Sequence, residues 1–123
     1  MPYHVVDPSE LDPMPDRPSD ARSISDAVGL QNLGLRRYDI APGEDMPVSG
    51  LHYHDEQEEV FYVVSGTLHV ETPDQEYVVP ADHFFVAEPG SPQRAFVHAD
   101  ADGNALVVAM GAPAGFDAHR YEP

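Results

Sequence analysis

Residues 50–66 read GLHYHDEQEEVFYVVSG, and this stretch decides the fold. In an extended strand the side chains of residues i and i+2 leave the same face, so His52 and His54 are expected to point together. After a turn, a second apolar run begins at Glu59. If the two runs pair antiparallel, the Glu59 carboxylate reaches the imidazoles, and two histidines with one carboxylate form the facial triad of non-haem iron sites. The alternative is a solvent-facing strand with surface histidines.

From Gly34 onward the whole chain has the pattern of an all-β domain. Short apolar or alternating runs, rich in Val, Phe and Tyr, are separated by turn residues such as Ser65-Gly66 and Pro89-Gly90. Many short strands at regular spacing are typical of a small antiparallel β-barrel or jelly roll. The expected strands are 35–40, 51–54, 59–64, 67–72, 76–79, 84–87, 93–98 and 105–110.

The N-terminal part differs in composition. It is rich in proline, aspartate and serine and has little apolar periodicity, which favours extended or loop-like chain. A chain of 123 residues is expected to form one domain. We therefore expect an extended N-terminal arm (1–33), a β-barrel (34–111) and a C-terminal tail (112–123).

The quoted stretch resembles the first conserved motif of the cupin superfamily. That motif runs Gly, five residues, His-x-His, three or four residues, Glu, six residues, Gly. His52, His54, Glu59 and Gly66 are in register with it, while Met46 stands at the position of the leading glycine. The resemblance implies a small single-domain cupin with its fold over about residues 34–111.

The second cupin motif, Gly, five residues, Pro-x-Gly, two residues, His, three residues, Asn, is degenerate here. Gly90 matches, and Gln93 stands at the histidine position. The other departures are Asp82 for Gly, Glu88 for Pro and Val97 for Asn. In the family a metal inside the barrel is usually held by three His and one Glu. The resemblance therefore implies a divalent transition metal (Fe, Mn, Zn, Ni or Cu) with the ligands His52, His54, Glu59 and Gln93.

Period-2 alternation also assigns faces to the strands. The expected inward-facing apolar residues are Phe61, Val63, Phe84, Val86, Ala95 and Val97. Tyr53, Tyr62 and Phe96 are expected on the outer face, where an exposed apolar sheet indicates a homodimer interface. Gln93 shares the parity of the inward set, whereas His98 does not, and His69 is expected to face outward.

Composition limits the function further. Asp and Glu number 22 against six arginines and no lysine, which gives a net charge of -16. This charge argues against nucleic-acid and anionic-membrane partners and favours a salt-adapted (halophilic) protein over an ordinary acidic cytosolic one. One of the scarce arginines Arg36, Arg37 and Arg94 could bind a substrate carboxylate, although surface pairing is the simpler interpretation. The absence of cysteine excludes disulfides, zinc ribbons and thiol nucleophiles.

No apolar run approaches the ~20 residues of a membrane span, and no secretory signal is visible, so a cytoplasmic protein is expected. Three functions are compatible with these features. The first is a metal-dependent enzyme acting on a small organic molecule, with dioxygenase-like chemistry and with Glu59 as a possible base. The second is a non-catalytic protein that binds a small ligand, and the third is an isomerase, epimerase or lyase using the same pocket.

Overall fold

The computed structural model describes residues 2–115 and 117–122. A 3-10 helix (Pro8–Glu10) and a five-residue helix α1 (Ile24–Val28) lie in the N-terminal part. No helix within the described part of the chain has the length and apolar character that crossing a membrane requires. The strands are β1 (Asp20–Ser23), β2 (Gly34–Ile40), β3 (His52–His54), β4 (Glu58–Ser65), β5 (Thr67–Glu71), β6 (Glu76–Pro80), β7 (Phe84–Ala87), β8 (Arg94–Phe96), β9 (Ala105–Ala112) and β10 (Ala118–Arg120).

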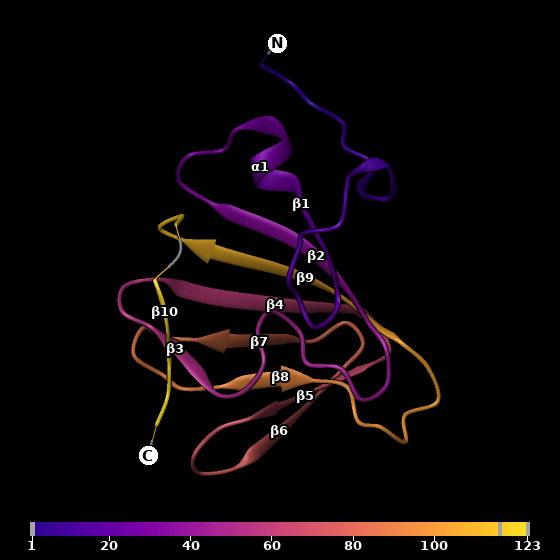
Figure 1. Ribbon diagram of the computed structural model, residues 1–123, viewed down its shortest axis with the longest axis vertical. Coiled ribbons are helices and arrows are strands. Elements are labelled where there is room, and N and C mark those ends of the chain that lie inside the picture. Colours follow the sequence, from indigo (N-terminus) through magenta and orange to yellow (C-terminus); the bar gives the residue numbers. More distant parts are fainter. Residues whose placement is uncertain (1, 116, 123) are drawn as a thin grey trace.

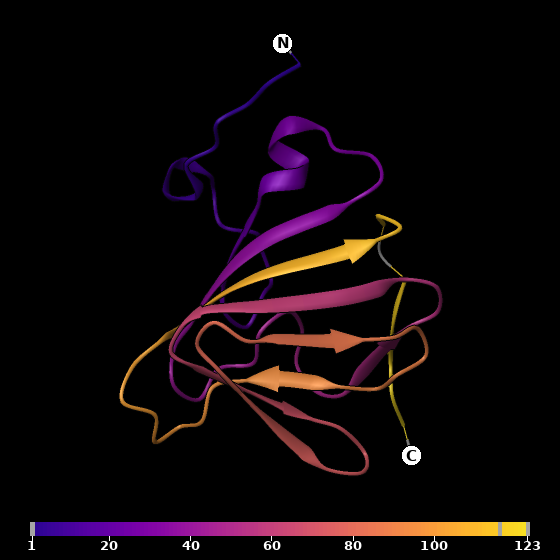
Figure 2. The same cartoon turned by 180° about the vertical axis from the view of Figure 1, so that it is seen from behind.

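The strands form three antiparallel sheets in the manner of a jelly roll. A five-stranded sheet has the order β1-β2-β9-β4-β7, a three-stranded sheet the order β6-β5-β8, and a two-stranded sheet pairs β10 with β3. Figures 1 and 2 show the larger sheet above the smaller one, with β3 and β10 together at one end. The sequence prediction of a small, nearly all-β cupin-like fold is therefore confirmed.

Alternation along the strands builds the core between the two larger sheets. On β4, Phe61 and Val63 are buried, as is Val107 on β9. Leu68 and Val70 of β5 contribute from the three-stranded sheet. Each of these strands buries every second side chain, as strands with one face on a core do.

Four of the six expected inward-facing residues lie in this core, namely Phe61, Val63, Ala95 and Val97. The prediction for Phe84 and Val86 was wrong, because these side chains are 62% and 61% exposed. The pairing register explains the difference: Phe85 lies opposite Phe61, and Phe84 lies opposite Tyr62. Directly opposed residues share a face of the sheet. Phe85 therefore faces the core, and Phe84 and Val86 face outward.

The prediction that Phe96 lies exposed was also wrong, because only 7% of it is accessible. The Arg94 guanidinium lies 3.9 Å from the centre of its ring, and His69 and His98 pack beside it. Arg94 is itself held by an ion pair with Asp45 at 2.7 Å. Phe96 is therefore covered by its near neighbours Arg94 and His98 and by His69 of β5, and alternation within β8 does not reveal this cover.

The N-terminal part carries more regular structure than its composition predicts. β1 pairs with β2 and extends the five-stranded sheet by one strand. The Ser23 hydroxyl then accepts a hydrogen bond from the backbone N–H of Asp26 and caps α1. The helix ends at Gly29, whose φ of +74° is the left-handed conformation that glycine tolerates. Elements this short show too little periodicity to be recognised in the sequence.

The outer face of β4 and β7 remains apolar and exposed. Val64 is 44% exposed, and Phe84 and Val86 are more exposed still. The Tyr62 and Phe84 rings pack at a tilt with their centroids 4.7 Å apart. An aromatic outer face was expected, but its main members are on β7 rather than at Phe96.

Candidate metal centre

The short strand β3 places two imidazoles on one face. Backbone hydrogen bonds in both directions join His52 to Gln93, at 3.0 and 2.9 Å, and β10 pairs with the other edge of β3. His52 and His54 are two residues apart, so their rings project together, with centroids 5.3 Å apart in an edge-to-face arrangement. Tyr53 points the other way and packs against His119.

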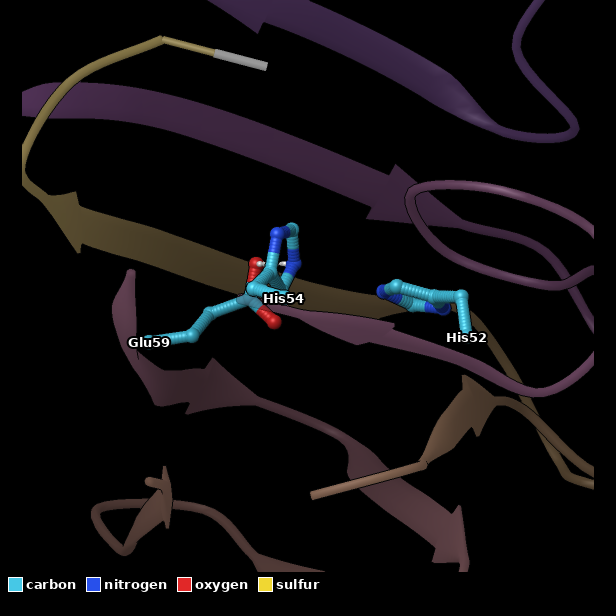
Figure 3. Close-up of side chains that lie close together, drawn as sticks. All are labelled: His52, His54 and Glu59. Carbon is cyan, nitrogen blue, oxygen red and sulfur yellow. Dashed lines mark ion pairs between the residues drawn. The ribbon is translucent and has the colours of Figure 1, made fainter. Parts of the chain in front are cut away.

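Glu59 lies on the inward face of β4 and brings its carboxylate to the same point. Its Oε2 atom is 3.5 Å from Nε2 of His54. His52, His54 and Glu59 each offer a ligand atom, and these atoms lie within 4.8 Å of one another. Figure 3 shows the three side chains close together, with the ion pair between His54 and Glu59. The structure thus brings together the two histidines and the carboxylate. The expected antiparallel pairing of the two runs was wrong, however, because β3 pairs with β10 and β4 pairs with β9 and β7.

Gln93 lies directly beside this set. Its side chain is buried, and its Nε2 donates a hydrogen bond of 2.6 Å to Oε1 of Glu59. His98, which lacks the inward parity, lies elsewhere, in a cluster with His69 and Glu76 on the outer face of the three-stranded sheet. The placement of Gln93 at the histidine position of the second motif therefore agrees with the geometry.

Several buried polar atoms of the site have no hydrogen-bond partner among the described residues. They are Nδ1 of His52, Oε1 of Gln93 and Nε2 of His54, whose ion pair with Glu59 at 3.5 Å is too long for a good hydrogen bond. Leaving a buried polar atom unpaired costs roughly 1–3 kcal/mol, so unpaired atoms rarely gather without a reason. Imidazole nitrogens and amide and carboxylate oxygens are all ligands of divalent transition metals. The residues present therefore fit a metal ion.

Asp117 was not singled out by the sequence, yet it positions His54. Its Oδ1 lies 2.8 Å from Nδ1 of His54, and its Oδ2 accepts hydrogen bonds from the backbone N–H groups of Glu56 and Gln57. A carboxylate on one ring nitrogen leaves the other free to bind a metal and fixes the orientation of the ring. Asp117 lies in the expected C-terminal tail, where no sequence motif marks it.

The two histidines have opposite pKa shifts. Burial lowers the pKa of His52, which keeps this imidazole neutral and able to bind a metal. The Glu59 carboxylate raises the pKa of His54, with Asp117 adding to the effect. A metal bound at Nε2 of His54 would replace the proton that this nitrogen carries when the ring is charged.

A cavity of ≈ 50 Å³ opens beside the three side chains. That volume holds a few water molecules or one small polar group. Strands β2 and β9 supply one wall, including Arg36 and the buried Tyr38, and the N-terminal segment adds Arg17. Neither Arg17 nor Tyr38 was a candidate from the sequence, because nothing in the local pattern links them to the His-x-His strand.

A second group of possible ligands lies on the outer face of the three-stranded sheet. Oε2 of Glu76 is 3.1 Å from Nδ1 of His69 and 3.3 Å from Nε2 of His98. This group, His69, Glu76 and His98, could also hold an ion. It is more exposed than the barrel site, and any metal measurement must separate the two.

The family pattern of the cupin domain matches residues 36–109, more than half of the chain, so the chain belongs to the cupin family. None of the curated proteins matches it in sequence. Solved structures similar to it include the polyketide cyclase RemF of Streptomyces resistomycificus, with a TM-score of 0.81 and 15% identity over 98% of this chain and 87% of that one.

Two proteins described as sugar phosphate isomerases are also similar. That of Silicibacter pomeroyi has a TM-score of 0.72 and 22% identity over 86% of this chain and 67% of that one. That of Acidithiobacillus ferrooxidans has a TM-score of 0.66 and 22% identity over 76% of this chain, which spans 58% of its length. At these identities the likeness concerns the fold.

Proposed function

We propose that the protein is a metal-dependent enzyme that acts on a small organic molecule. The supporting observation is the group of unpaired buried atoms, Nδ1 of His52 and Nε2 of His54, beside the Glu59 carboxylate. The ligands would be His52, His54 and Glu59, with the amide oxygen of Gln93 as a weaker fourth donor. A bound divalent metal would act as a Lewis acid or redox centre next to the cavity.

The protein side chains have separate tasks in this proposal. Gln93 donates to Oε1 of Glu59, which leaves Oε2 to bind the metal or to accept a proton. Asp117 holds Nδ1 of His54 and thereby directs Nε2 toward the site.

Two reaction classes fit the site. The two-histidine, one-carboxylate set is typical of non-haem iron oxygenases, which favours dioxygenase-like chemistry. The names of the similar structures, a cyclase and sugar phosphate isomerases, favour a rearrangement with proton transfer and without oxygen. We give the dioxygenase first place because its argument rests on residues of this chain.

Elemental analysis of protein purified without chelators and without nickel affinity resin tests the proposal. We expect about one divalent metal per chain in the double variant His69→Ala/His98→Ala, which lacks the outer group. Iron together with oxygen uptake on a panel of small organic molecules would support the dioxygenase, and oxygen-independent turnover would support the rearrangement. If this variant neither carries nor takes up a metal on titration, the proposed function is wrong.

We also propose that a second copy of the chain covers the exposed apolar face of β4 and β7. A large apolar patch on a free surface favours association, and identical subunits with a net charge of -16 each repel less as salt screens them. Sedimentation should therefore show a dimer that strengthens with salt. Val86→Glu should shift the protein toward monomer, whereas Val78→Glu, equally exposed at 61% on β6, should not. A wild-type monomer at every salt concentration would contradict this expectation.

A further inference from the structure

Within the described part of the chain, two of the six arginines form ion pairs with carboxylates, and of the other four only two line the cavity beside the candidate metal centre. Arg22 and Arg94 form ion pairs with carboxylates, Arg22 with Asp20 at 2.7 Å and Arg94 with Asp45 at 2.7 Å. Arg94 also pairs with a second carboxylate. This is the expected behaviour of scarce cations in a chain with a net charge of -16.

Arg17 and Arg36 behave differently. Both line the cavity beside the candidate metal centre, and neither pairs with a carboxylate among residues 2–115 and 117–122. A half-buried guanidinium without an anionic partner has lost part of its hydration without the compensation of an ion pair. Two such groups on one small cavity indicate that the missing partner is a ligand.

The backbone holds each arginine in place. Arg36 lies on β2 between Ser23 of β1 and Ala109 of β9 and has the inward parity of the buried Tyr38. Its neighbour Arg37 also lacks an ion pair, and its buried Nε has no partner among the described residues, but it has the opposite parity and does not line the cavity. The charge of Arg36 is therefore placed on the inner wall of the fold, where apolar residues are the rule.

Arg17 reaches the cavity from the N-terminal segment. Its Nη1 donates a hydrogen bond of 3.2 Å to the carbonyl oxygen of Pro47, a residue that also lines the cavity. This bond orients the guanidinium and leaves its other N–H groups available. The N-terminal segment, which has no role in the metal set, thus contributes directly to the cavity.

We infer that the cavity binds the carboxylate of a small organic acid through Arg17 and Arg36. A guanidinium presents paired N–H donors that match a carboxylate, and charge-assisted hydrogen bonds of this kind are among the strongest in proteins. A volume of ≈ 50 Å³ suits a small acid whose remaining oxygens face His52, His54 and Glu59. That this acid is the substrate rests on the proposed function, whereas the anion site itself does not.

The test compares pyruvate with its neutral amide, pyruvamide, and with inorganic phosphate. Binding to the zinc-loaded and to the metal-free protein is measured by calorimetry and NMR at one fixed chloride concentration. We expect pyruvate to bind at least about tenfold more tightly than pyruvamide, because one charge-assisted hydrogen bond exceeds 1.4 kcal/mol. Phosphate binding more tightly than pyruvate would overturn the assignment to a carboxylate.

Variants locate the effect. Arg36→Gln and Arg17→Gln should each weaken pyruvate binding about tenfold and leave pyruvamide binding unchanged. The control is Arg120→Gln, which removes an exposed arginine outside the cavity and should change neither. Circular dichroism checks that each variant is folded. Equal affinity of wild type and both cavity variants for pyruvate would overturn the inference.

The metal content of the same samples separates this inference from the proposed function. Arg36→Gln is expected to keep the metal of the wild type. If the protein takes up no metal but still prefers pyruvate over pyruvamide through Arg36, the anion site stands and the enzyme proposal fails. If the metal binds but the arginine variants lose nothing, the anion site alone is wrong.

Discussion

Replacing His54 by alanine is expected to weaken zinc binding at the barrel site by at least about 100-fold, since it removes a ligand and not only its support. His52→Ala and Glu59→Ala should have similar effects. Gln93→Ala should be milder, because water can replace a neutral oxygen donor, and Gln93→His should tighten binding. The measurement is a competition titration against a chromophoric zinc chelator.

Two further variants show whether the geometry is right. Asp117→Asn should weaken zinc binding about 10–100-fold through the orientation of His54, although Asp117 would touch no metal. His98→Ala should leave the barrel site unchanged, since His98 belongs to the outer group with His69 and Glu76. If His98→Ala proved more damaging than Gln93→Ala, the placement of the second motif would be wrong.

Gly66→Ala is expected to lower the free energy of unfolding by about 2–5 kcal/mol. Gly66 forms the turn between β4 and β5 with a φ of +77°, which costs a residue with a side chain roughly 1–2 kcal/mol. A Cβ there would also lie 2.5 Å from the carbonyl oxygen of Asn104 and 2.8 Å from Cα of Ala105. Both contacts are with backbone atoms, which cannot rotate away as a flexible side chain could.

Gly90→Ala is the matched control. Gly90 has the same φ of +77°, but a Cβ there would meet nothing within 4 Å. Its substitution should therefore cost only the backbone term, about 1–2 kcal/mol. Urea denaturation of the metal-free proteins gives both values. Equal losses of unfolding free energy in the two variants would show that the close approach of Gly66 to the start of β9 does not contribute to the effect.

Local patterns in the sequence were sufficient for much of the fold. Strand alternation and regularly spaced turn residues predicted the antiparallel all-β architecture, because the period of side chains along a strand is a property of the chain itself. The spacing from His52 to Glu59 also indicated three clustered side chains, although they meet between two sheets and not through the expected pairing of the two strands. The positive φ at Gly66 is equally local, whereas the close approach of Asn104 and Ala105 to it is a tertiary contact.

The predicted face of a side chain was wrong where the register between strands decided it. Phe84 and Phe85 are both apolar, and only the pairing of β7 with β4 shows that Phe85 lies opposite Phe61. A shift of the pairing register by one residue moves every side chain of a strand to the other face. Two adjacent apolar residues therefore do not show which of them faces the core. Phe96 likewise became buried through Arg94, whose position depends on acidic partners in other segments.

The sequence by itself determined the class of fold and the His52, His54 and Glu59 set, because both follow from residues close together along the chain. Only the tertiary structure placed Asp117 against His54, across 63 positions, through the pairing of β10 with β3. It alone also brought Arg17 to the cavity from the N-terminal segment. Contacts between residues so far apart in the sequence depend on how the sheets pack and how the connecting segments run. The information that determines them is spread over the whole chain.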